Sequence, residues 1–411
     1  MRVLSRPRHH YKLAKMSSTP KLLLKNLIRR ESFTSGKAVD QLQERLTTYF
    51  GAKVFVVNSG RSAIFLTLKA LGIGHGDEVL IQAYTCNAVP NPVLWSGAVP
   101  VYVDIDEHSL NMSLDDLKAK ITPSAKAIIV QHTFGNPAKI REILKIAEQH
   151  KLKVIEDCAH SLGARLDNRL LGTFGDMAIV SFGREKVISS LSGGALIVND
   201  PALVEKVDKL VAPLKVLPKR KILQEIGNYF SWRVLFRRIY NKNWGSNLVR
   251  FLYQFDVVNV VTSQKELSGL KPAWYPSKLP DILAKLALQE FDKLEGYNSQ
   301  RAQVAEKYFE RLKNSNVKLI GPHPGIYLRV VGLHPRASSI LAEAKKRKLS
   351  FGNWYNSVVY PEGTHLARLG YRSGSCPVAE QVAAQTINLP NYLGMTDIEV
   401  DKVISFLKSY G

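Results

Sequence analysis

The sequence predicts an α/β fold in which a mostly parallel sheet is covered by helices on both faces. Between residues 51 and 200, short apolar runs alternate with helix-sized segments. Most of these runs are continuous stretches of valine, isoleucine and leucine, which is typical of strands buried on both faces. The chain has 411 residues, of which 45% are hydrophobic and 22% charged, enough for a sizeable core. Alternating strands and helices predict parallel strands joined by right-handed crossovers.

Seven runs are predicted as strands, at residues 53–57, 78–81, 99–103, 126–131, 152–156, 177–181 and 194–198. Helix-sized segments separate several of them, for example residues 60–72 and 136–150. From residue 281, leucine and phenylalanine recur at helical spacing, which predicts one long amphipathic helix leading into a smaller C-terminal α+β domain. We expect four parts: a basic N-terminal arm (1–30), a large α/β domain (31–212), a basic–aromatic insertion (213–270), and a bridging helix with the small domain (271–411).

The composition restricts the class of partner and the compartment. A formal net charge of +22 favours anionic partners, but no zinc-finger, RRM or basic-zipper pattern is present, so nucleic acid is not expected. Three widely spaced cysteines, Cys86, Cys158 and Cys376, indicate neither a disulfide framework nor a metal site and suit a reducing cytoplasm. The N-terminus lacks the apolar core of a secretory signal, and no run is long and apolar enough to predict a membrane span.

The insertion at 213–270 interleaves aromatic residues with lysine and arginine. One interpretation is a pair of helices with basic faces toward solvent. The other is a platform for an anionic membrane surface, because aromatic and basic side chains together suit the lipid interface. The second interpretation predicts peripheral contact with the inner face of a membrane.

Two segments that follow predicted strands contain groups suited to a ligand. In open α/β sheets, ligands bind outside the carboxyl ends of the strands. Residues 58–63, "NSGRSA", would place backbone N–H groups and small side chains at a helix start, which suits a phosphate but is also ordinary turn and cap chemistry. A helical turn in "EDCAH" (156–160) would direct Asp157 and His160 into one cavity, although a structural histidine is the simpler interpretation.

A third segment adds an amine. Ser181 ends the strand at 177–181, and Lys186 follows five residues later in a loop. Together the three segments predict phosphate donors, a carboxylate and a lysine around one crevice. Pyridoxal phosphate (PLP) requires this set of groups.

At these residues the chain resembles the DegT/DnrJ/EryC1/StrS family of PLP-dependent sugar aminotransferases. The resemblance extends from about residue 32 to residue 200 and is weaker over the C-terminal third. Its motifs are "NSGRSAIFLTLKALGIGHGDEVL", "GAVPVYVDID", "VIEDCAHSLGA", "GTFGDMAIVSF", and Lys186 followed by "SGG". It implies the fold type I of PLP-dependent transferases, a homodimer, and amino transfer from an amino acid, typically glutamate, to a nucleotide-linked keto-sugar in surface-glycan or amino-sugar biosynthesis.

The resemblance also assigns roles to residues of this chain. Lys186 is similar to the lysine that forms the Schiff base with the cofactor and carries the proton. Asp157 is similar to the acid at the pyridine nitrogen, and His160 stands where the family has Gln or His near the ring's 3-oxygen. The residues that would hold the phosphate are Gly60, Arg61, Ser62 and Ser181.

At the positions expected around the cofactor ring and the acceptor, this chain follows the family's pattern less closely. Where the family places an aromatic residue over the ring, this chain has Cys86, with Tyr84 two residues before it. A thiol can also pack on a ring. In the segment 353–365, Trp354 and Tyr355 are candidate acceptor contacts, and ordinary core aromatics are the equally supported alternative.

The segment 275–280, "YPSKLP", departs further from the family. The family's asparagine that reaches the phosphate of a neighbouring subunit aligns with Pro276, which cannot replace it, while Lys278 offers a charge. This departure and Cys86 favour an alternative class, a non-catalytic regulator or scaffold at a membrane surface. A sugar dehydratase of the same fold is a further alternative, but its signature has histidine in place of Lys186.

Overall fold

The computed structural model of the chain describes residue 34 and residues 36–231 and 262–410. The predicted basic N-terminal arm (1–30) and residues 232–261 of the predicted insertion lie outside the described residues.

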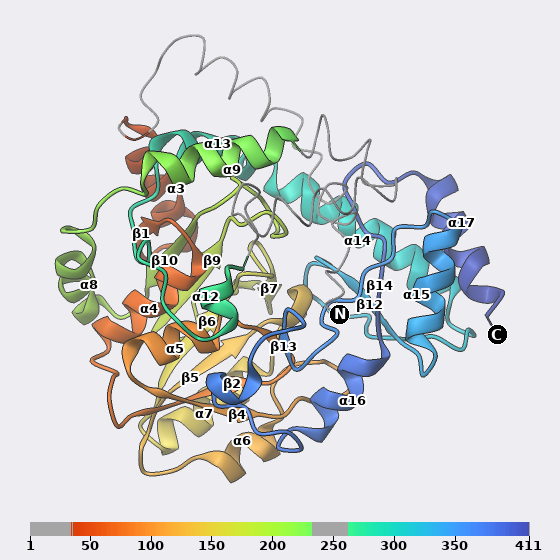
Figure 1. The fold of residues 1–411 in the computed structure, drawn as a ribbon, viewed down its shortest axis with the longest axis horizontal. Helices are drawn as coiled ribbons and strands as arrows, with labels where there is room; N and C mark the ends of the chain where they lie inside the picture. Colours follow the sequence, from red (N-terminus) through yellow and green to blue (C-terminus); the bar gives the residue numbers. More distant parts are fainter. Residues whose placement is uncertain (1–33, 35, 232–261, 411) are drawn as a thin grey trace.

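A seven-stranded sheet forms the centre of the larger part of the molecule (Figure 1), in the order β1-β10-β9-β6-β5-β2-β4. Its strands are β1 (Lys53–Val57), β2 (Glu78–Gln82), β4 (Val99–Val103), β5 (Ala125–Gln131), β6 (Lys153–Asp157), β9 (Met177–Ser181) and β10 (Gly194–Val198). Strand β10 runs antiparallel to β1 and β9, and the other neighbouring strands are parallel. All seven predicted strands therefore lie in one mostly parallel sheet, which confirms the predicted fold class.

Helices cover both faces of this sheet because alternate side chains of its strands enter two different cores. In β1, Val54 and Val56 belong to one core, and Phe55 and Val57 belong to the other. The helices that close the first core are α3 (Ala38–Phe50), α6 (Leu114–Lys120), α7 (Ile140–Gln149), α9 (Lys219–Ser231) and α13 (Asp281–Phe291). Those that close the second are α4 (Gly60–Ala70), α5 (Pro90–Ser96), α8 (Val204–Val211) and α16 (Pro377–Gln385).

A smaller α+β part with its own core lies at the end of the molecule opposite α8 (Figure 1). Its antiparallel sheet consists of β11 (Lys318–Leu319), β12 (Val330–Leu333) and β14 (Thr386–Leu389). Its helices are α14 (Leu294–Arg311), α15 (Ala337–Lys346) and α17 (Asp397–Lys408). Short paired segments complete the described structure: β3 (Thr85–Cys86) with β13 (Val359–Tyr360), and β7 (Arg165–Leu166) with β8 (Arg169–Leu170).

The single long helix predicted from residue 281 is wrong, because the segment forms α13 and α14 with a break between residues 291 and 294. Leu283 and Leu286 of α13 lie in the first sheet core. Val304 and Tyr308 of α14 lie in the core of the smaller part. The break lets each helix follow its own core, and hydrophobic spacing alone does not distinguish two helices from one.

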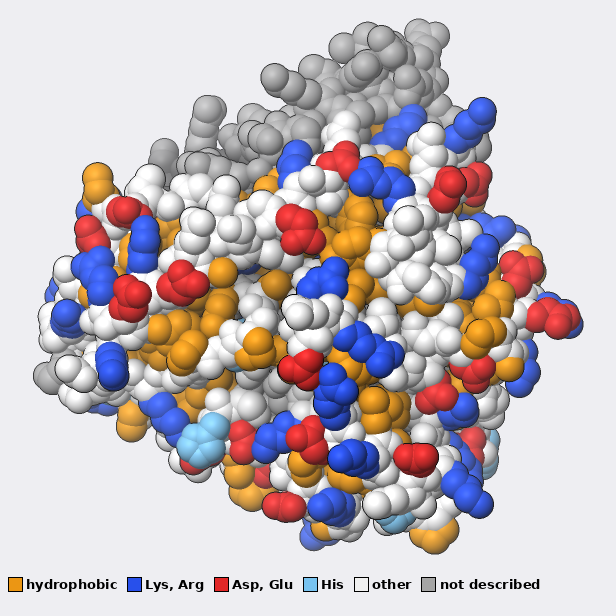
Figure 2. All heavy atoms as spheres, turned by 180° about the vertical axis from the view of Figure 1, so that it is seen from behind, with side chains coloured by type: hydrophobic (Ala, Val, Ile, Leu, Met, Phe, Trp, Pro, Cys, Tyr) orange, Lys and Arg blue, Asp and Glu red, His pale blue; other side chains and the backbone are white. Residues whose placement is uncertain are grey.

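Helix α9 is the largest described element of the predicted insertion. It buries Ile222, Ile226 and Tyr229 in the first core and exposes Lys219 and Arg220. This part of the segment is thus a core helix with a basic face toward solvent. On the face shown in Figure 2, lysine and arginine side chains are interspersed with acidic ones. Among the helices of the described residues, none has the length and apolar character needed to cross a membrane.

Candidate active site

The carboxyl ends of β1, β6 and β9 lie at the same edge of the sheet. Strand β9 is parallel to β6, and β10 lies antiparallel between β9 and β1, so the three strands point in one direction. The residues that follow them meet: a Cβ atom added to Gly60 would lie 3.3 Å from the Cβ of Ser181. The charges of Asp157 and Lys186 also influence each other's pKa. The structure thus brings together the three segments that the sequence singled out.

Helix α4 begins in the loop after β1, at the segment that the sequence predicts to bind a phosphate. Ser59 is its N-cap, and the Ser59 hydroxyl accepts the backbone N–H of Ser62 at 3.1 Å. The Ser62 hydroxyl donates to Oδ1 of Asn58 at 2.6 Å, so both serine side chains fix the helix start. The first turn of a helix directs backbone N–H groups outward and favours an anion. A Cβ atom at position 60 would lie 3.3 Å from the Cβ of Ser181, a tight contact that glycine avoids.

The guanidinium of Arg61 is engaged by an acid from another segment. Its Nε lies 2.9 Å from Oε1 of Glu266, and both side chains are largely buried. Glu266 belongs to α12 (Gln264–Leu267), where it also closes a capping box with Ser263. The contribution of Arg61 to phosphate binding stays a prediction, for which its backbone N–H in the first turn of α4 is the better placed group.

Asp157 and Lys186 lie close enough for their opposite charges to influence each other's pKa. Asp157 ends β6, is 5% exposed, and accepts the backbone N–H of Ala159 at 2.9 Å. Burial raises the pKa of Asp157, and the nearby Lys186 opposes that rise. Burial lowers the pKa of Lys186, and Asp157 opposes that fall. The amine therefore releases its proton more readily than an exposed lysine does.

His160 is held as a neutral ring against an aromatic neighbour. Its centroid lies 5.5 Å from that of Phe134, with 6° between the ring planes. Its Nδ1 accepts the backbone N–H of Phe134 at 3.4 Å, which leaves Nε2, 3.4 Å from the Tyr355 hydroxyl, as the protonated nitrogen. Burial, then the charges of Lys186 and Arg329, lower the pKa of His160 well below its ordinary value.

The substitution His160→Gln is expected to weaken the acid sensitivity of folding. Below about pH 6.5 an unfolded histidine gains a proton that the buried ring resists, so this residue costs stability as the pH falls. Between pH 7.5 and 5.5, we expect the wild type to lose about 1 kcal/mol more free energy of unfolding than the variant. Urea denaturation at the two pH values measures this difference, with His108→Gln, at an exposed position, as control. An equal loss of free energy of unfolding in the wild type and in His160→Gln would contradict the assignment of His160 as a buried neutral ring.

Tyr84 and Tyr355 are core aromatic residues that connect the two parts of the molecule. Their exposed fractions are 0% and 2%, and their rings meet edge to face at 5.4 Å. The Tyr84 hydroxyl accepts the backbone N–H of Tyr355 at 3.2 Å and lies 2.7 Å from the Thr386 hydroxyl in β14. These contacts support the core alternative for Tyr355. The predicted roles of Tyr84 at the cofactor ring and of Tyr355 at the acceptor stay predictions.

Trp354 and Cys86 remain partly exposed near Lys186. The Trp354 ring centroid lies 6.0 Å from Lys186 Nζ and 5.8 Å from the His160 ring centroid. Cys86 lies in β3, and the parallel pairing of β3 with β13 brings the segment around residue 359 beside it. The structure therefore gathers both residues at the predicted site.

The segment 275–280 packs on the loop after β1 of the same chain. The backbone N–H of Asn58 donates to the carbonyl of Ser277 at 3.0 Å, and the N–H of Ser277 donates to Asn58 Oδ1 at 3.2 Å. The amine of Lys278 donates to the carbonyl of Ala212 at 2.8 Å. A contact of Lys278 with the phosphate of a partner subunit stays a prediction, as does the replacement for the asparagine that Pro276 excludes.

Two residues at this site were missed by the sequence interpretation. Phe134 stacks on His160, and the Cζ atom of Arg329 lies 4.7 Å from the Trp354 ring centroid. Arg329 interrupts the apolar run "IYLRVVGL" (326–333), where a charged residue is unexpected. This charged residue within an apolar run could have drawn attention to Arg329. No feature of the sequence around Phe134 distinguishes it from an ordinary core residue.

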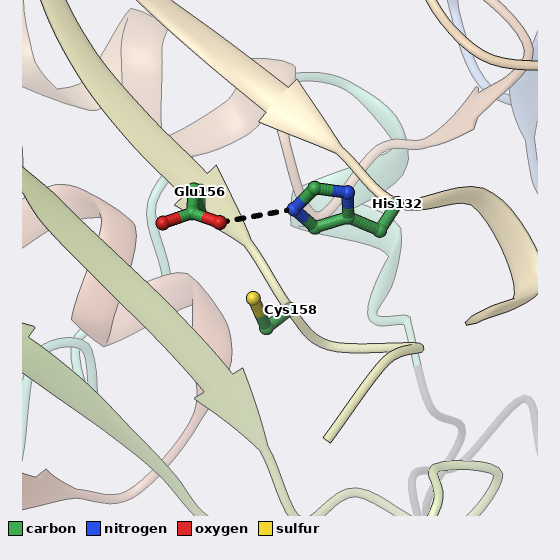
Figure 3. Close-up of side chains that lie close together, drawn as sticks. All are labelled: His132, Glu156 and Cys158. Carbon is green, nitrogen blue, oxygen red and sulfur yellow. Dashed lines mark hydrogen bonds and ion pairs between the residues drawn. The ribbon is translucent and has the colours of Figure 1, made fainter. Parts of the chain in front are cut away.

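A buried cluster of His132, Glu156 and Cys158 lies at the carboxyl end of β6 (Figure 3). His132 Nδ1 accepts the backbone N–H of Ala138 at 3.1 Å, so its Nε2 carries the proton and donates to Glu156 at 3.2 Å. The Glu156 carboxylate also accepts three backbone N–H groups, from Gly172, Phe174 and Gly175. Burial raises the pKa of the Cys158 thiol, with Glu156 adding to the rise. The His132 nitrogen that faces Glu156 carries a proton, the Glu156 carboxylate already accepts four hydrogen bonds, and Cys158 is a thiol. These groups form a structural hydrogen-bond network and not a set of metal ligands.

The groups at the sheet edge fit the cofactor that the resemblance implies. The amine of Lys186, the carboxylate of Asp157 and the first turn of α4 match the aldehyde, ring nitrogen and phosphate of PLP. The glycine at position 60 leaves free the space that a Cβ atom would fill beside Ser181. Gly60, Lys186 and Trp354 also keep intermediate exposure among buried neighbours. Lys186 would hold the aldehyde carbon, Asp157 the ring nitrogen, and α4 the phosphate.

Comparison with known families identifies the class of protein. The family model described as the DegT/DnrJ/EryC1/StrS aminotransferase family matches residues 16–229 and 247–408. The chain therefore belongs to this family, which confirms the resemblance seen in its motifs.

Among curated relatives, the chain is 29% identical over 356 residues to a UDP-N-acetyl-3-dehydro-alpha-D-glucosamine 3-aminotransferase of Acidithiobacillus ferrooxidans, covering 85% of this chain and 82% of that one. It is 26% identical over 384 residues to the GDP-perosamine synthase of Caulobacter vibrioides, covering 90% of each. Its fold is similar to that of Spr1654 from Streptococcus pneumoniae in the PLP form, with a TM-score of 0.74, 20% identity and 97% of each chain covered.

Proposed function

We propose that this aminotransferase moves an amino group from an amino acid, with glutamate as the expected donor, to the keto group of a nucleotide-linked sugar. Pyridoxal phosphate is its cofactor. The relatives named for UDP- and GDP-linked amino sugars support this acceptor class. The observation that carries the proposal is the meeting of Lys186, Asp157 and the start of α4 at one sheet edge. Synthesis of surface glycans or other amino sugars is the corresponding process.

Lys186, Asp157 and His160 would each have a different role in the amino transfer. When bound, pyridoxal phosphate supplies an electron sink for the carbon that loses a proton. Lys186 would hold and move that proton at Nζ, since its lowered pKa makes the free amine more available near neutral pH. Asp157 would keep a proton at the ring nitrogen. The neutral His160 would pack beside the ring without adding a charge.

The visible absorbance of the PLP-loaded protein tests this function. We expect a band that glutamate removes and that a nucleotide-linked keto-sugar restores. The two additions separate the two halves of the reaction, and a panel of amino acids and of UDP-, GDP- and dTDP-linked keto-sugars identifies donor and acceptor. A band that no amino acid changes would contradict an aminotransferase function and favour the scaffold alternative.

Two further parts of the proposal concern partners. A homodimer is proposed from the resemblance. Peripheral contact with an anionic membrane is proposed from the composition of residues 213–270, of which the exposed basic residues of α9 are the described part.

A further inference from the structure

Arg329 is a buried cation without a hydrogen bond. It directly precedes β12, and only 8% of its surface is exposed. Its closest acidic partner is Glu185, at 4.0 Å from Nη2 to Oε2, which is beyond hydrogen-bond range. No described residue accepts a hydrogen bond from its guanidinium. The nitrogen atoms of this group are not among the fully buried polar atoms that lack a partner, so its five N–H donors stay within reach of a further acceptor.

Other largely buried arginines of the described chain are paired. Arg301 is 3% exposed and donates to the carbonyl of Val187 at 2.8 Å and to Oδ1 of Asn298 at 3.1 Å. Arg61 lies 2.9 Å from Glu266. Arg329 has no hydrogen-bond acceptor of this kind, and its ion pair with Glu185 is longer, at 4.0 Å, so its donors stay available to a ligand.

The guanidinium of Arg329 borders the residues proposed to react. Its Cζ atom lies 4.7 Å from the Trp354 ring centroid, a cation–π distance. The same centroid lies 6.0 Å from Lys186 Nζ and 5.8 Å from the His160 ring. The charge of Arg329 also contributes, after burial, to the lowered pKa values of both Lys186 and His160. An anion bound by Arg329 would therefore lie next to the reactive amine.

We propose that Arg329, with the Trp354 ring packed on its guanidinium, binds a carboxylate of the amino-acid donor. This inference rests on the proposed function. An amino acid that presents its nitrogen at Lys186 carries a carboxylate only a few bonds away. The planar fork of arginine matches a carboxylate with two parallel hydrogen bonds, and lysine supplies only a point charge. The start of α4 is proposed to bind the phosphate of the cofactor. The carboxylate of the donor therefore needs a second anion-binding group.

Isothermal titration calorimetry of the PLP-loaded protein with maleate, an unreactive dicarboxylate, tests the proposal. The variants are Arg329→Gln and Arg329→Lys, and Arg336→Gln repeats the same change at an exposed position. We expect Arg329→Gln to raise the Kd for maleate roughly 10- to 100-fold, because charge-assisted hydrogen bonds are lost. Arg329→Lys should retain part of the affinity, and Arg336→Gln should leave it unchanged. Thermal denaturation of each variant shows whether it is folded.

Titration with inorganic pyrophosphate distinguishes a phosphate receptor from a carboxylate receptor. An unchanged Kd for pyrophosphate alongside weaker maleate binding supports the proposal. The proposal is overturned if Arg329→Gln weakens pyrophosphate binding without weakening maleate binding, or weakens both equally. It is also overturned if Arg329→Gln leaves the Kd for maleate unchanged. The visible band of the wild type is recorded in the same samples. Its absence would count against the proposed function, while the calorimetric comparison would still decide the role of Arg329.

Discussion

Replacing Lys186 by alanine is expected to abolish the lysine-dependent visible band and to reduce amino transfer by a factor of at least about 10² to 10⁴, the usual contribution of a positioned proton-transfer group. The lysine is close to the buried Asp157 and to the partly exposed ring of Trp354, and burial lowers the pKa of its amine. Alanine removes both the nucleophile and the proton carrier. Absorbance spectra and single-turnover measurements with glutamate record the two losses separately.

Lys186→Arg is the matched variant for this prediction. It keeps the positive charge beside Asp157, but a guanidinium does not release its proton near neutral pH. If Lys186 acts only as a counter-charge, the arginine variant should keep its activity; if it moves a proton, the variant should be as inactive as Lys186→Ala. Lys206→Ala, at an exposed position on α8, controls for the loss of any lysine. Undiminished transfer in Lys186→Ala would contradict the proposed mechanism.

The strands of the large sheet were predictable because each is a continuous apolar run buried on both faces. The antiparallel direction of β10 was not, since the side chains of a central strand have the same environment in either direction. The break between α13 and α14 also escaped prediction. It depends on which core each helix contacts, and that is decided by residues far away in the sequence.

The site was predictable where strand ends carry polar residues, as at Asp157 and Ser181, or where a strand leads into a helix start, as at Gly60. These residues meet because their strands run in one direction, which the α/β pattern implies. Arg329 and Phe134 come from segments whose approach to Lys186 depends on how the smaller part packs against the sheet, and no local pattern encodes that. The pairing of Arg61 with Glu266 was hidden for the same reason, since the two residues are far apart in the chain.

Replacing Glu156 by leucine is expected to lower the free energy of unfolding by about 3 to 5 kcal/mol, as for other broken buried polar pairs. Glu156 is fully buried and accepts hydrogen bonds from His132 Nε2 and from the backbone of Gly172, Phe174 and Gly175 (Figure 3). Leucine has a similar size but no acceptor, so these donors would be buried without partners. Urea denaturation measures the loss, and the exposed Glu148→Gln on α7 is the control.

The chelator EDTA separates this network from a metal site at the same residues. A network held by hydrogen bonds should keep its Tm in EDTA, because no ion contributes to its stability. If His132, Glu156 and Cys158 instead bind a metal, EDTA should lower the Tm of the wild type and should not lower that of Glu156→Leu further. Because Glu156 anchors the loop at residues 172–175 next to the strand that ends in Asp157, its loss is also expected to loosen the acid proposed to hold the cofactor ring. Weaker PLP retention in a folded Glu156→Leu protein would connect the two effects.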